Sequence, residues 1–268
     1  MNYILTNSYE AMSKKAASLI CAQILMKPAC VLGLATGSTP IGAYKQLAAL
    51  FKAGELSFKD VSTVNLDEYC GLQETHPQSY RTYMNTNLFN NIDIEKHNTY
   101  VPDGMVQDYA QECAKYDKTS HELGGIDLQL HGIGNNGHIG FNEPGEEFIM
   151  GTHRVLLSED TISANSRFFE NEVSNVPTAA LTMGLRGIMH ARKVVLLACG
   201  KAKLEIIDRA LYGPVTPKLP ASILQLHPDL TVICAKECYY KTGLEKRKLF
   251  QTCFELFIKT LETLHNKI

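Results

Sequence analysis

The sequence has none of the features that mark a membrane or a secreted protein. No stretch approaches the roughly 20 consecutive apolar residues of a membrane helix, and residues 1–6 lack the long apolar core of a signal peptide. Charge is balanced as well, because 26 Lys and Arg stand against 28 Asp and Glu, and no basic run stands out. These absences argue against nucleic acid and membrane partners, and we expect a soluble, cytoplasmic protein.

Paired cysteines are also absent. There is no Cys-x-x-Cys, and the closest two of the eight cysteines, Cys234 and Cys238, lie four positions apart. A disulfide framework or a zinc site would need paired residues, so we expect reduced thiols, as is typical of cytosolic proteins. The other cysteines are Cys21, Cys30, Cys70, Cys113, Cys199 and Cys253.

Short, nearly continuous apolar runs alternate with longer segments whose apolar residues recur at helical spacing. This alternation predicts a doubly wound α/β fold with an open, mostly parallel sheet flanked by helices. No internal repeat or linker interrupts the pattern, so residues 1–268 are interpreted as one domain. The expected strands are 29–35, 61–66, 126–130, 194–199 and 230–235, and the expected helices include 8–26, 40–53 and 106–122.

Polar residues follow three of the expected strands, at the sheet edge where such folds bind ligands. After the first comes Thr-Gly-Ser-Thr-Pro (36–40), in which Pro40 suits the first turn of a helix. Gly37, Ser38 and Thr39 can then offer N–H and hydroxyl groups to an anion at the positive helix end. The alternative is an ordinary capped helix. The Gly-Lys-Ser/Thr ending of a nucleotide-binding loop is missing, which favours a monophosphate.

The second expected strand ends in Asp67-Glu68-Tyr69. A carboxylate at the tip of a buried strand can face a cleft, where desolvation raises its pKa toward that of a useful general base. The alternative interpretation is that Asp67 caps the next turn and that Glu68 is solvated.

The third cluster, residues 131–144, contains four glycines, two histidines, three asparagines and a glutamate, which is typical of an active-site loop. Residues 132–137 match the dinucleotide pattern G-x-G-x-x-G, but Gly140 and Pro144 would break the helix that this pattern requires. A metal site from His131, His138 and Glu143 is conceivable, although the spacing fits no standard motif. Proton transfer by His138, oriented by a neighbouring residue, is the more natural interpretation.

Four segments together resemble the glucosamine-6-phosphate deaminases, in order and in spacing. They are Leu-Gly-Leu-Ala-Thr-Gly-Ser-Thr-Pro (32–40), Asn-Leu-Asp-Glu-Tyr (65–69), Gly-Ile-Gly-Asn-Asn-Gly-His-Ile-Gly-Phe-Asn-Glu-Pro (132–144) and Asn-Ser-Arg-Phe-Phe (165–169). The third block is highly specific, whereas 6-phosphogluconolactonases share the first more loosely. The resemblance implies a Rossmann-like fold and conversion of glucosamine 6-phosphate and water to fructose 6-phosphate and ammonia, without metal or organic cofactor.

The resemblance also implies roles for individual residues. Asp67 would move a proton from C2 to C1, and His138 would open the sugar ring, supported by Asn136 and Glu143. The substrate phosphate would bind Gly37, Ser38 and Thr39 and be neutralised by Arg167 and Lys203, through charge-assisted hydrogen bonds. Because Arg167 must reach the phosphate, the resemblance further implies that residues 158–178 form a mobile lid. The alternative is a fixed helix pair.

Two departures from the family pattern carry consequences. Some members have aspartate at position 136, and we expect the neutral Asn136 to accept from the imidazole N–H without stabilising an imidazolium, so that Glu143 does more of the orienting. Members activated by N-acetylglucosamine 6-phosphate place hydroxyl and basic side chains after the proline at 144. Here Glu146, Glu147, His153 and Val155 stand in that stretch, and two carboxylates would repel a phosphate. No such activation is expected.

Two other functions stay open at this point. A 6-phosphogluconolactonase would need a hydrolytic arrangement around the histidine and no proton shuttle between C1 and C2. A sugar-phosphate-binding regulator without chemistry would bind the ligand and release no ammonia. The preference among hexosamine 6-phosphates and the oligomeric state, including a homo-oligomer, also stay open.

Overall fold

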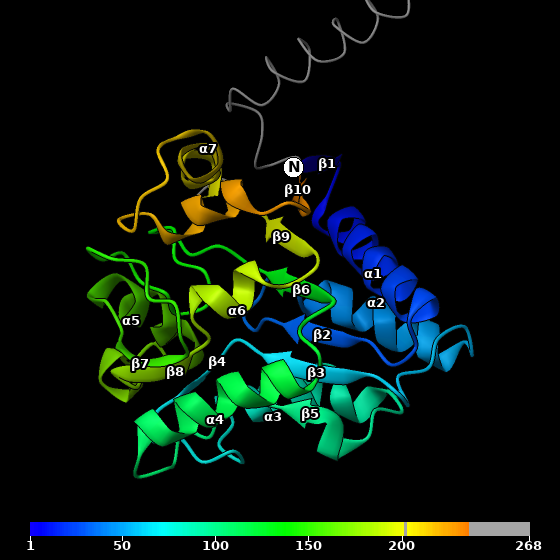
Figure 1. Cartoon of the computed structure of the whole chain (residues 1–268), viewed down its shortest axis with the longest axis horizontal. Coiled ribbons are helices and arrows are strands. Elements are labelled where there is room, and N and C mark those ends of the chain that lie inside the picture. Colours follow the sequence, from blue (N-terminus) through cyan, green and yellow to red (C-terminus); the bar gives the residue numbers. More distant parts are fainter. Residues whose placement is uncertain (201–202, 236–268) are drawn as a thin grey trace, which may run out of the picture.

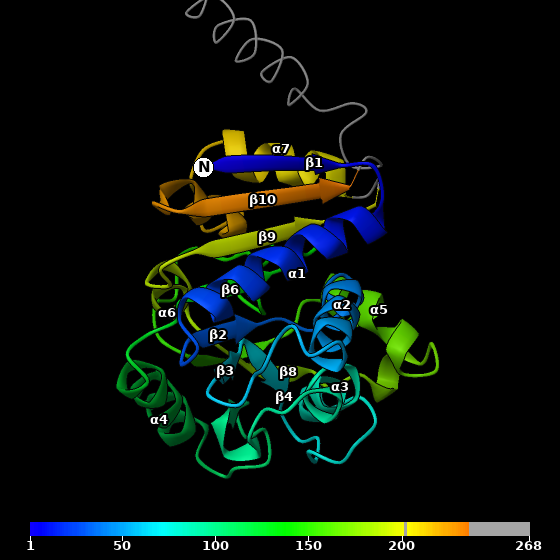
Figure 2. The same ribbon diagram turned by 90° about the vertical axis from the view of Figure 1, so that its right-hand side faces the viewer.

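The protein is built around one parallel sheet. The computed structural model describes residues 1–200 and 203–235, so Cys238, Cys253 and the end of the expected domain lie outside the described residues. Within the described part the sheet has seven strands: β1 (Asn2–Thr6), β2 (Val31–Leu34), β3 (Ser62–Asn65), β5 (Thr99–Tyr100), β6 (Leu128–His131), β9 (Val194–Ala198) and β10 (Leu230–Ala235). Their order is β1-β10-β9-β6-β2-β3-β5, and Figure 2 shows it from β1 to β3. All five expected strands are confirmed, whereas β1 and β5 were not expected.

Helices cover both faces of this sheet (Figure 1). On one face α1 (Tyr9–Met26), α2 (Ile41–Lys52) and α3 (Tyr80–Asn87) enclose a core with Leu32, Leu34 and Leu197. On the other, α4 (Tyr109–Glu122), α6 (Leu185–Met189) and α7 (Leu204–Tyr212) pack on Val64, Val194 and Leu196. The expected open, doubly wound sheet is therefore confirmed, as are helices α1, α2 and α4. No helix in the described ranges combines the length and apolar character needed to cross a membrane.

The winding of the chain places a crevice between β2 and β6. From β2 the chain proceeds outward through β3 and β5, and it returns to the other side of β2 with β6, from which β9, β10 and β1 extend the sheet. Neighbouring strands whose connections leave in opposite directions define the switch point at which doubly wound folds bind ligands. The segments that follow β2 and β6 are the 36–40 turn and the 132–144 loop.

A second, antiparallel sheet adjoins the first and was not expected from the sequence. It consists of β4 (Asp67–Tyr69), β8 (Ala179–Thr182) and β7 (His153–Leu156), with β8 in the middle. In its register Asp67 pairs with Thr182. A small third core, which includes Tyr69, Phe141 and Phe169, packs against it.

Within residues 1–200 and 203–235, the elements still to be described include one short helix and several 3₁₀ turns. Residues 158–178, the predicted lid, contain α5 (Glu159–Asn165), η3 (Ser166–Phe168) and η4 (Val173–Asn175). That this segment moves stays a prediction. The other 3₁₀ turns are η1 (Phe89–Asn91), η2 (Lys96–Asn98) and η6 (Pro220–Leu226).

A buried carboxylate clamps the opposite end of the sheet from the crevice. Asp127, 3% exposed, precedes β6 and accepts hydrogen bonds from the Lys27 ammonium (2.8 Å), the Arg192 guanidinium (3.0 Å) and the Val31 backbone N–H (2.8 Å). It thereby ties the end of α1, the start of β2 and the segment before β9 together.

Because removal of this carboxylate leaves the Val31 N–H without its acceptor, Asp127→Ala should lower the free energy of unfolding by about 2–4 kcal/mol. Denaturant titration measures the loss. The control is Glu122→Ala, which removes an exposed i,i+4 pair with Lys118 (3.6 Å) and should cost below about 1 kcal/mol. An equal loss of unfolding free energy in the two variants would show that Asp127 contributes no more than an exposed ion pair.

Candidate active site

A cavity of about 520 Å³ opens at the carboxyl ends of β2 and β6. Seven of the nine predicted site residues line it, namely Gly37, Ser38, Thr39, Asp67, His138, Arg167 and Lys203. The other two, Asn136 and Glu143, lie behind His138 as hydrogen-bond partners in its loop. Segments far apart in the sequence therefore converge on one chamber, of a size typical for small-molecule sites.

Two tyrosine hydroxyls hold the backbone of the 36–40 turn. Gly37 has φ +88°, a left-handed conformation that favours glycine. Its carbonyl oxygen accepts from the Tyr83 hydroxyl (2.6 Å), and the Ser38 carbonyl accepts from the Tyr9 hydroxyl (3.1 Å). The helix begins at Ile41, one residue after the expected start at Pro40. With these carbonyls engaged, the turn and the start of α2 suit an anion.

Two cations reach the same cavity from other parts of the chain. Arg167 lies in η3, with its guanidinium carbon 4.7 Å from the centre of the Phe168 ring. The Lys203 ammonium donates to the Asn135 side-chain oxygen (2.6 Å), which attaches it to the histidine loop. A chain with a net charge of −2 thus places two cations on the lining of the cavity that also contains the turn at 37–39.

Asp67 supplies a buried carboxyl group on the cavity wall. It is 5% exposed, and burial, together with the neighbouring charge of Glu68, raises its pKa from 3.8 to about 8. A carboxylate with this pKa is a much stronger base than an exposed one. Gly140 passes close by, since a Cβ built there would lie 3.4 Å from an Asp67 carboxyl oxygen and 3.0 Å from the Thr182 hydroxyl.

The neighbouring Glu68 is a structural cap. It is 2% exposed and accepts from the backbone N–H groups of Tyr69 (2.9 Å), Tyr80 (2.9 Å) and Arg81 (3.0 Å) and from the Ser79 hydroxyl (3.1 Å). Burial raises its pKa, and these hydrogen bonds oppose the rise in part. The alternative interpretation, a solvated Glu68 beside a capping Asp67, is therefore wrong, because Glu68 covers the start of α3.

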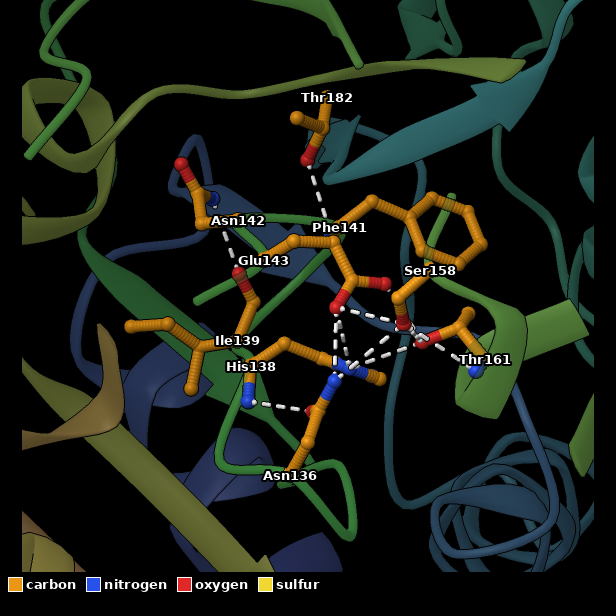
Figure 3. Close-up of polar contacts among 9 residues, drawn as sticks. All are labelled: Asn136, His138, Ile139, Phe141, Asn142, Glu143, Ser158, Thr161 and Thr182. Carbon is orange, nitrogen blue, oxygen red and sulfur yellow. Dashed lines mark hydrogen bonds and ion pairs between the residues drawn. The ribbon is translucent and has the colours of Figure 1, made fainter. Parts of the chain in front are cut away.

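His138 is fixed by a network of acceptors and hydroxyls (Figure 3). Its Nδ1 lies 3.8 Å from a carboxyl oxygen of Glu143 and 3.5 Å from the Thr161 hydroxyl. Gly134 leaves room for the ring, since a Cβ built there would stand 2.4 Å from its Cε1. The ring therefore packs closely against the Gly134 backbone and has polar neighbours at Nδ1.

Glu143 stays ionised at any working pH. Burial would raise its pKa, but hydrogen bonds and the charge interaction with His138, and hydrogen bonds from Thr161 and Asn136, outweigh burial and hold the pKa at about 2. The donors are the Asn136 amide (2.7 Å), the Ser158 hydroxyl (3.2 Å) and the Thr161 hydroxyl (2.5 Å).

The expected contact between Asn136 and the imidazole is wrong. The side-chain oxygen of Asn136 accepts from the backbone N–H of His138 (3.2 Å), and its NH₂ group donates to Glu143. The amide bridges the loop to the carboxylate because it offers a donor and an acceptor at once, which an aspartate cannot do. Glu143 is the charged group beside the ring, as the sequence analysis expected for a chain with asparagine at 136.

Several site residues escaped the sequence analysis. Nothing in the sequence pointed to Tyr83, and Ser158 and Thr161 were included only as part of the segment 158–178. Asn165, part of the quoted Asn-Ser-Arg-Phe-Phe segment, donates to the Tyr69 hydroxyl (2.9 Å). His131, by contrast, is 1% exposed, and burial lowers its pKa to about 3. Among the described residues, no three His, Cys, Asp or Glu side chains are grouped as metal ligands.

Fold and cavity together are typical of an α/β enzyme that binds a small anionic ligand. A family model described as glucosamine-6-phosphate isomerases/6-phosphogluconolactonase matches residues 6–233, and the chain belongs to this family. It is 57% identical to a glucosamine-6-phosphate deaminase of Lachnoclostridium phytofermentans over 88% of this chain and 100% of that protein. It is 54% identical to one of Thermoanaerobacter pseudethanolicus, over 88% and 93% respectively.

Solved structures agree with this placement. A structure described as a monomeric glucosamine-6-phosphate deaminase superposes with a TM-score of 0.87 at 44% identity, covering 89% of this chain and 98% of that one. A 6-phosphogluconolactonase from Trypanosoma cruzi has a TM-score of 0.71 at 20% identity, with 90% of this chain and 96% of that one covered, which shows a shared fold alone.

The raised pKa of Asp67 makes stability depend on pH. Between pH 4 and 8 the folded protein holds a proton on Asp67 that the unfolded chain has released, so the unfolding free energy falls as pH rises toward 8. Asp67→Asn cannot ionise, and its melting temperature should exceed that of the wild type by several degrees at pH 8 while matching it near pH 4. Asp60→Asn, an exposed control, should show no such trend, and an equal response in both variants would refute the buried charge.

Proposed function

We propose that this chain converts glucosamine 6-phosphate and water to fructose 6-phosphate and ammonia. The observation that carries the proposal is the convergence, in one cavity, of the Asp67 carboxyl group, the His138 imidazole and the turn at 37–39. The similarity to glucosamine-6-phosphate deaminases over nearly their full lengths supports the same reaction.

The phosphate of the substrate binds first in this scheme. The N–H and hydroxyl groups of Gly37, Ser38 and Thr39 receive its oxygens, and Arg167 and Lys203 neutralise its charge. Binding energy at this remote group fixes the position of the sugar, whose reacting carbons then lie toward Asp67 and His138.

His138 opens the ring. Its imidazole accepts the proton of the C1 hydroxyl and returns a proton to the ring oxygen as the C1–O5 bond breaks, which gives the open-chain aldehyde. Glu143 stabilises the imidazolium that forms, because its carboxylate remains ionised throughout.

Asp67 carries out the isomerisation. Its carboxylate removes the proton from C2, the electron pair forms the C1=C2 bond as the C1=O bond opens, and the aldehyde oxygen takes a proton from the C2 ammonium group, which gives an enolamine. The same carboxyl group then returns its proton to C1. The product is an iminium at C2, which adds water and expels ammonia. An ammonium group on C2 of the bound substrate favours the ionised form of this otherwise neutral carboxyl.

The decisive experiment measures ammonia release from a panel of hexosamine 6-phosphates. Turnover should occur with kcat/KM rising about tenfold per pH unit up to about pH 8, as Asp67 loses its proton, and levelling above. Asp67→Asn should abolish turnover and leave the affinity for the sugar phosphate nearly unchanged. An active Asp67→Asn enzyme would exclude this residue as the base.

Isotope exchange separates the two alternatives. In deuterated water, the proton that Asp67 takes from C2 exchanges with solvent before its return, so turnover introduces deuterium at C1 of the product. A 6-phosphogluconolactonase would hydrolyse its lactone without exchange at C1 or C2. A regulator without chemistry would bind the sugar phosphate and release no ammonia. The presence of Asp67, His138 and Glu143 in one site favours the enzyme.

Location and assembly belong to the same proposal. Cys21, Cys30, Cys70 and Cys113 are free thiols, which suits a reducing compartment, so the cytoplasm is the proposed location of the activity. A homo-oligomer stays a prediction without a direct test, and size-exclusion chromatography decides between it and the monomer described for the solved relative.

We expect N-acetylglucosamine 6-phosphate to leave the kinetics unchanged. In the stretch after Pro144, Glu146 and Glu147 are exposed, and their negative charge would repel a phosphate. The nearby Lys218 ammonium is paired with the Glu146 carboxylate at 3.4 Å. Initial rates with and without this ligand should give superimposable hyperbolic curves. A sigmoidal curve that becomes hyperbolic on its addition would contradict the expectation.

A further inference from the structure

A threonine outside the cavity lining joins the two groups that handle the ring proton. Thr161, in the first turn of α5, is 3% exposed. Its hydroxyl donates to Glu143 Oε1 at 2.5 Å and lies 3.5 Å from His138 Nδ1 (Figure 3). A single hydroxyl group thus touches both the imidazole and its carboxylate.

Donor and acceptor accounting decides where the protons are. The distances favour Glu143 as the acceptor of the Thr161 proton, since 2.5 Å is a full hydrogen bond and 3.5 Å is a long one. The hydroxyl oxygen then faces Nδ1 as an acceptor. The Ser158 hydroxyl lies 3.0 Å from Thr161 Oγ1 and 3.2 Å from Glu143 Oε2. Because it has a single proton, it can donate to only one of these oxygens, and at least one lone pair of Thr161 Oγ1 is left for the imidazole.

The edge of His138 at Nδ1 therefore meets acceptors alone: the Thr161 hydroxyl oxygen and, at 3.8 Å, Glu143 Oε2. A neutral imidazole satisfies such an edge only when the proton sits on Nδ1, which leaves the lone pair on Nε2. A base that takes a hydroxyl proton from a sugar in the cavity needs that lone pair.

We propose that Thr161 is a positioning residue that holds His138 in the Nδ1–H tautomer, and that it acts by donating to Glu143 while accepting from the imidazole. The proposal rests on the proposed function for its kinetic consequence, and its structural consequence is independent of any substrate. Valine at this position keeps the shape and removes both hydrogen bonds, whereas serine keeps the hydroxyl.

The chain offers a matched control. Thr152 is likewise buried, and its hydroxyl donates to Asp117 at 2.5 Å, yet neither residue lines the cavity. Thr152→Val therefore removes a hydrogen bond of the same kind, from threonine to carboxylate, without touching the imidazole.

The test compares Thr161→Val, Thr161→Ser and Thr152→Val with the wild type. Thr161→Val should lower kcat for ammonia release about 10- to 100-fold with KM within about twofold, because the phosphate contacts are intact. Thr161→Ser should recover most of kcat, and Thr152→Val should keep it. Should Thr161→Val fail to fold, Thr161→Ala gives the same test.

Nitrogen-15 NMR of labelled histidines, with His138 assigned through a His138→Gln variant, supplies a readout that needs no substrate. The wild type should show protonated Nδ1 and unprotonated Nε2, and Thr161→Val a mixture of tautomers. An unchanged tautomer and kcat in Thr161→Val, or equal damage in Thr161→Ser or Thr152→Val, would overturn the proposal. If the wild type releases no ammonia while Thr161→Val still changes the tautomer of His138, the proposed function is refuted and this inference stands.

Discussion

The site depends on the pairing of β2 with β6, which brings the turn at 36–40 beside the loop at 132–144. The register places Gly33 opposite Gln129, and a Cβ built on Gly33 would stand 1.9 Å from the Gln129 side-chain oxygen. Only a glycine on β2 leaves space for this amide in the interior. Because the two strands lie at the switch point of the sheet, the segments that follow them, 36–40 and 132–144, border the same crevice.

Three carboxyl groups within reach of this crevice show how surroundings set their chemistry. Asp67 receives burial with little compensation, and its pKa rises to about 8. Glu68 is as deeply buried, but N–H groups at the start of α3 surround it. Glu143 is held by three hydrogen-bond donors and an imidazole, and its pKa falls to about 2. The balance between solvent exclusion and hydrogen bonding thus gives one carboxyl group a raised pKa, makes the second a helix cap and keeps the third ionised.

Much of this arrangement could be predicted from the sequence, and the physical reasons for the failures are specific. Strands buried on both faces leave continuous apolar runs, so β2, β3, β6, β9 and β10 were recognisable. The strand β4 was not, because Asp-Glu-Tyr is polar and becomes buried only through partners supplied by α3 and β8.

Side-chain contacts were harder to predict than the location of the site. Residues such as Asp67 and His138 could be located because they follow strands in segments rich in polar groups and glycine. The partner of Asn136 could not, since an amide beside a histidine in the sequence can bond either its ring or its backbone. Thr161 carried no signal, because a threonine in the first turn of a helix is unremarkable until its distance to Glu143 is known.

The cap that Glu68 places on α3 has a consequence for substrate choice. Asp67 and Glu68 are adjacent in β4, and the capped helix carries Tyr83. The Tyr83 hydroxyl donates to the Gly37 carbonyl oxygen in the turn at 36–40. A continuous chain of contacts therefore joins the proposed base to the proposed phosphate-binding turn. These contacts fix the separation between the two sites. A ligand therefore fits only when the right number of carbon atoms separates its phosphoryl group from the carbon that loses a proton.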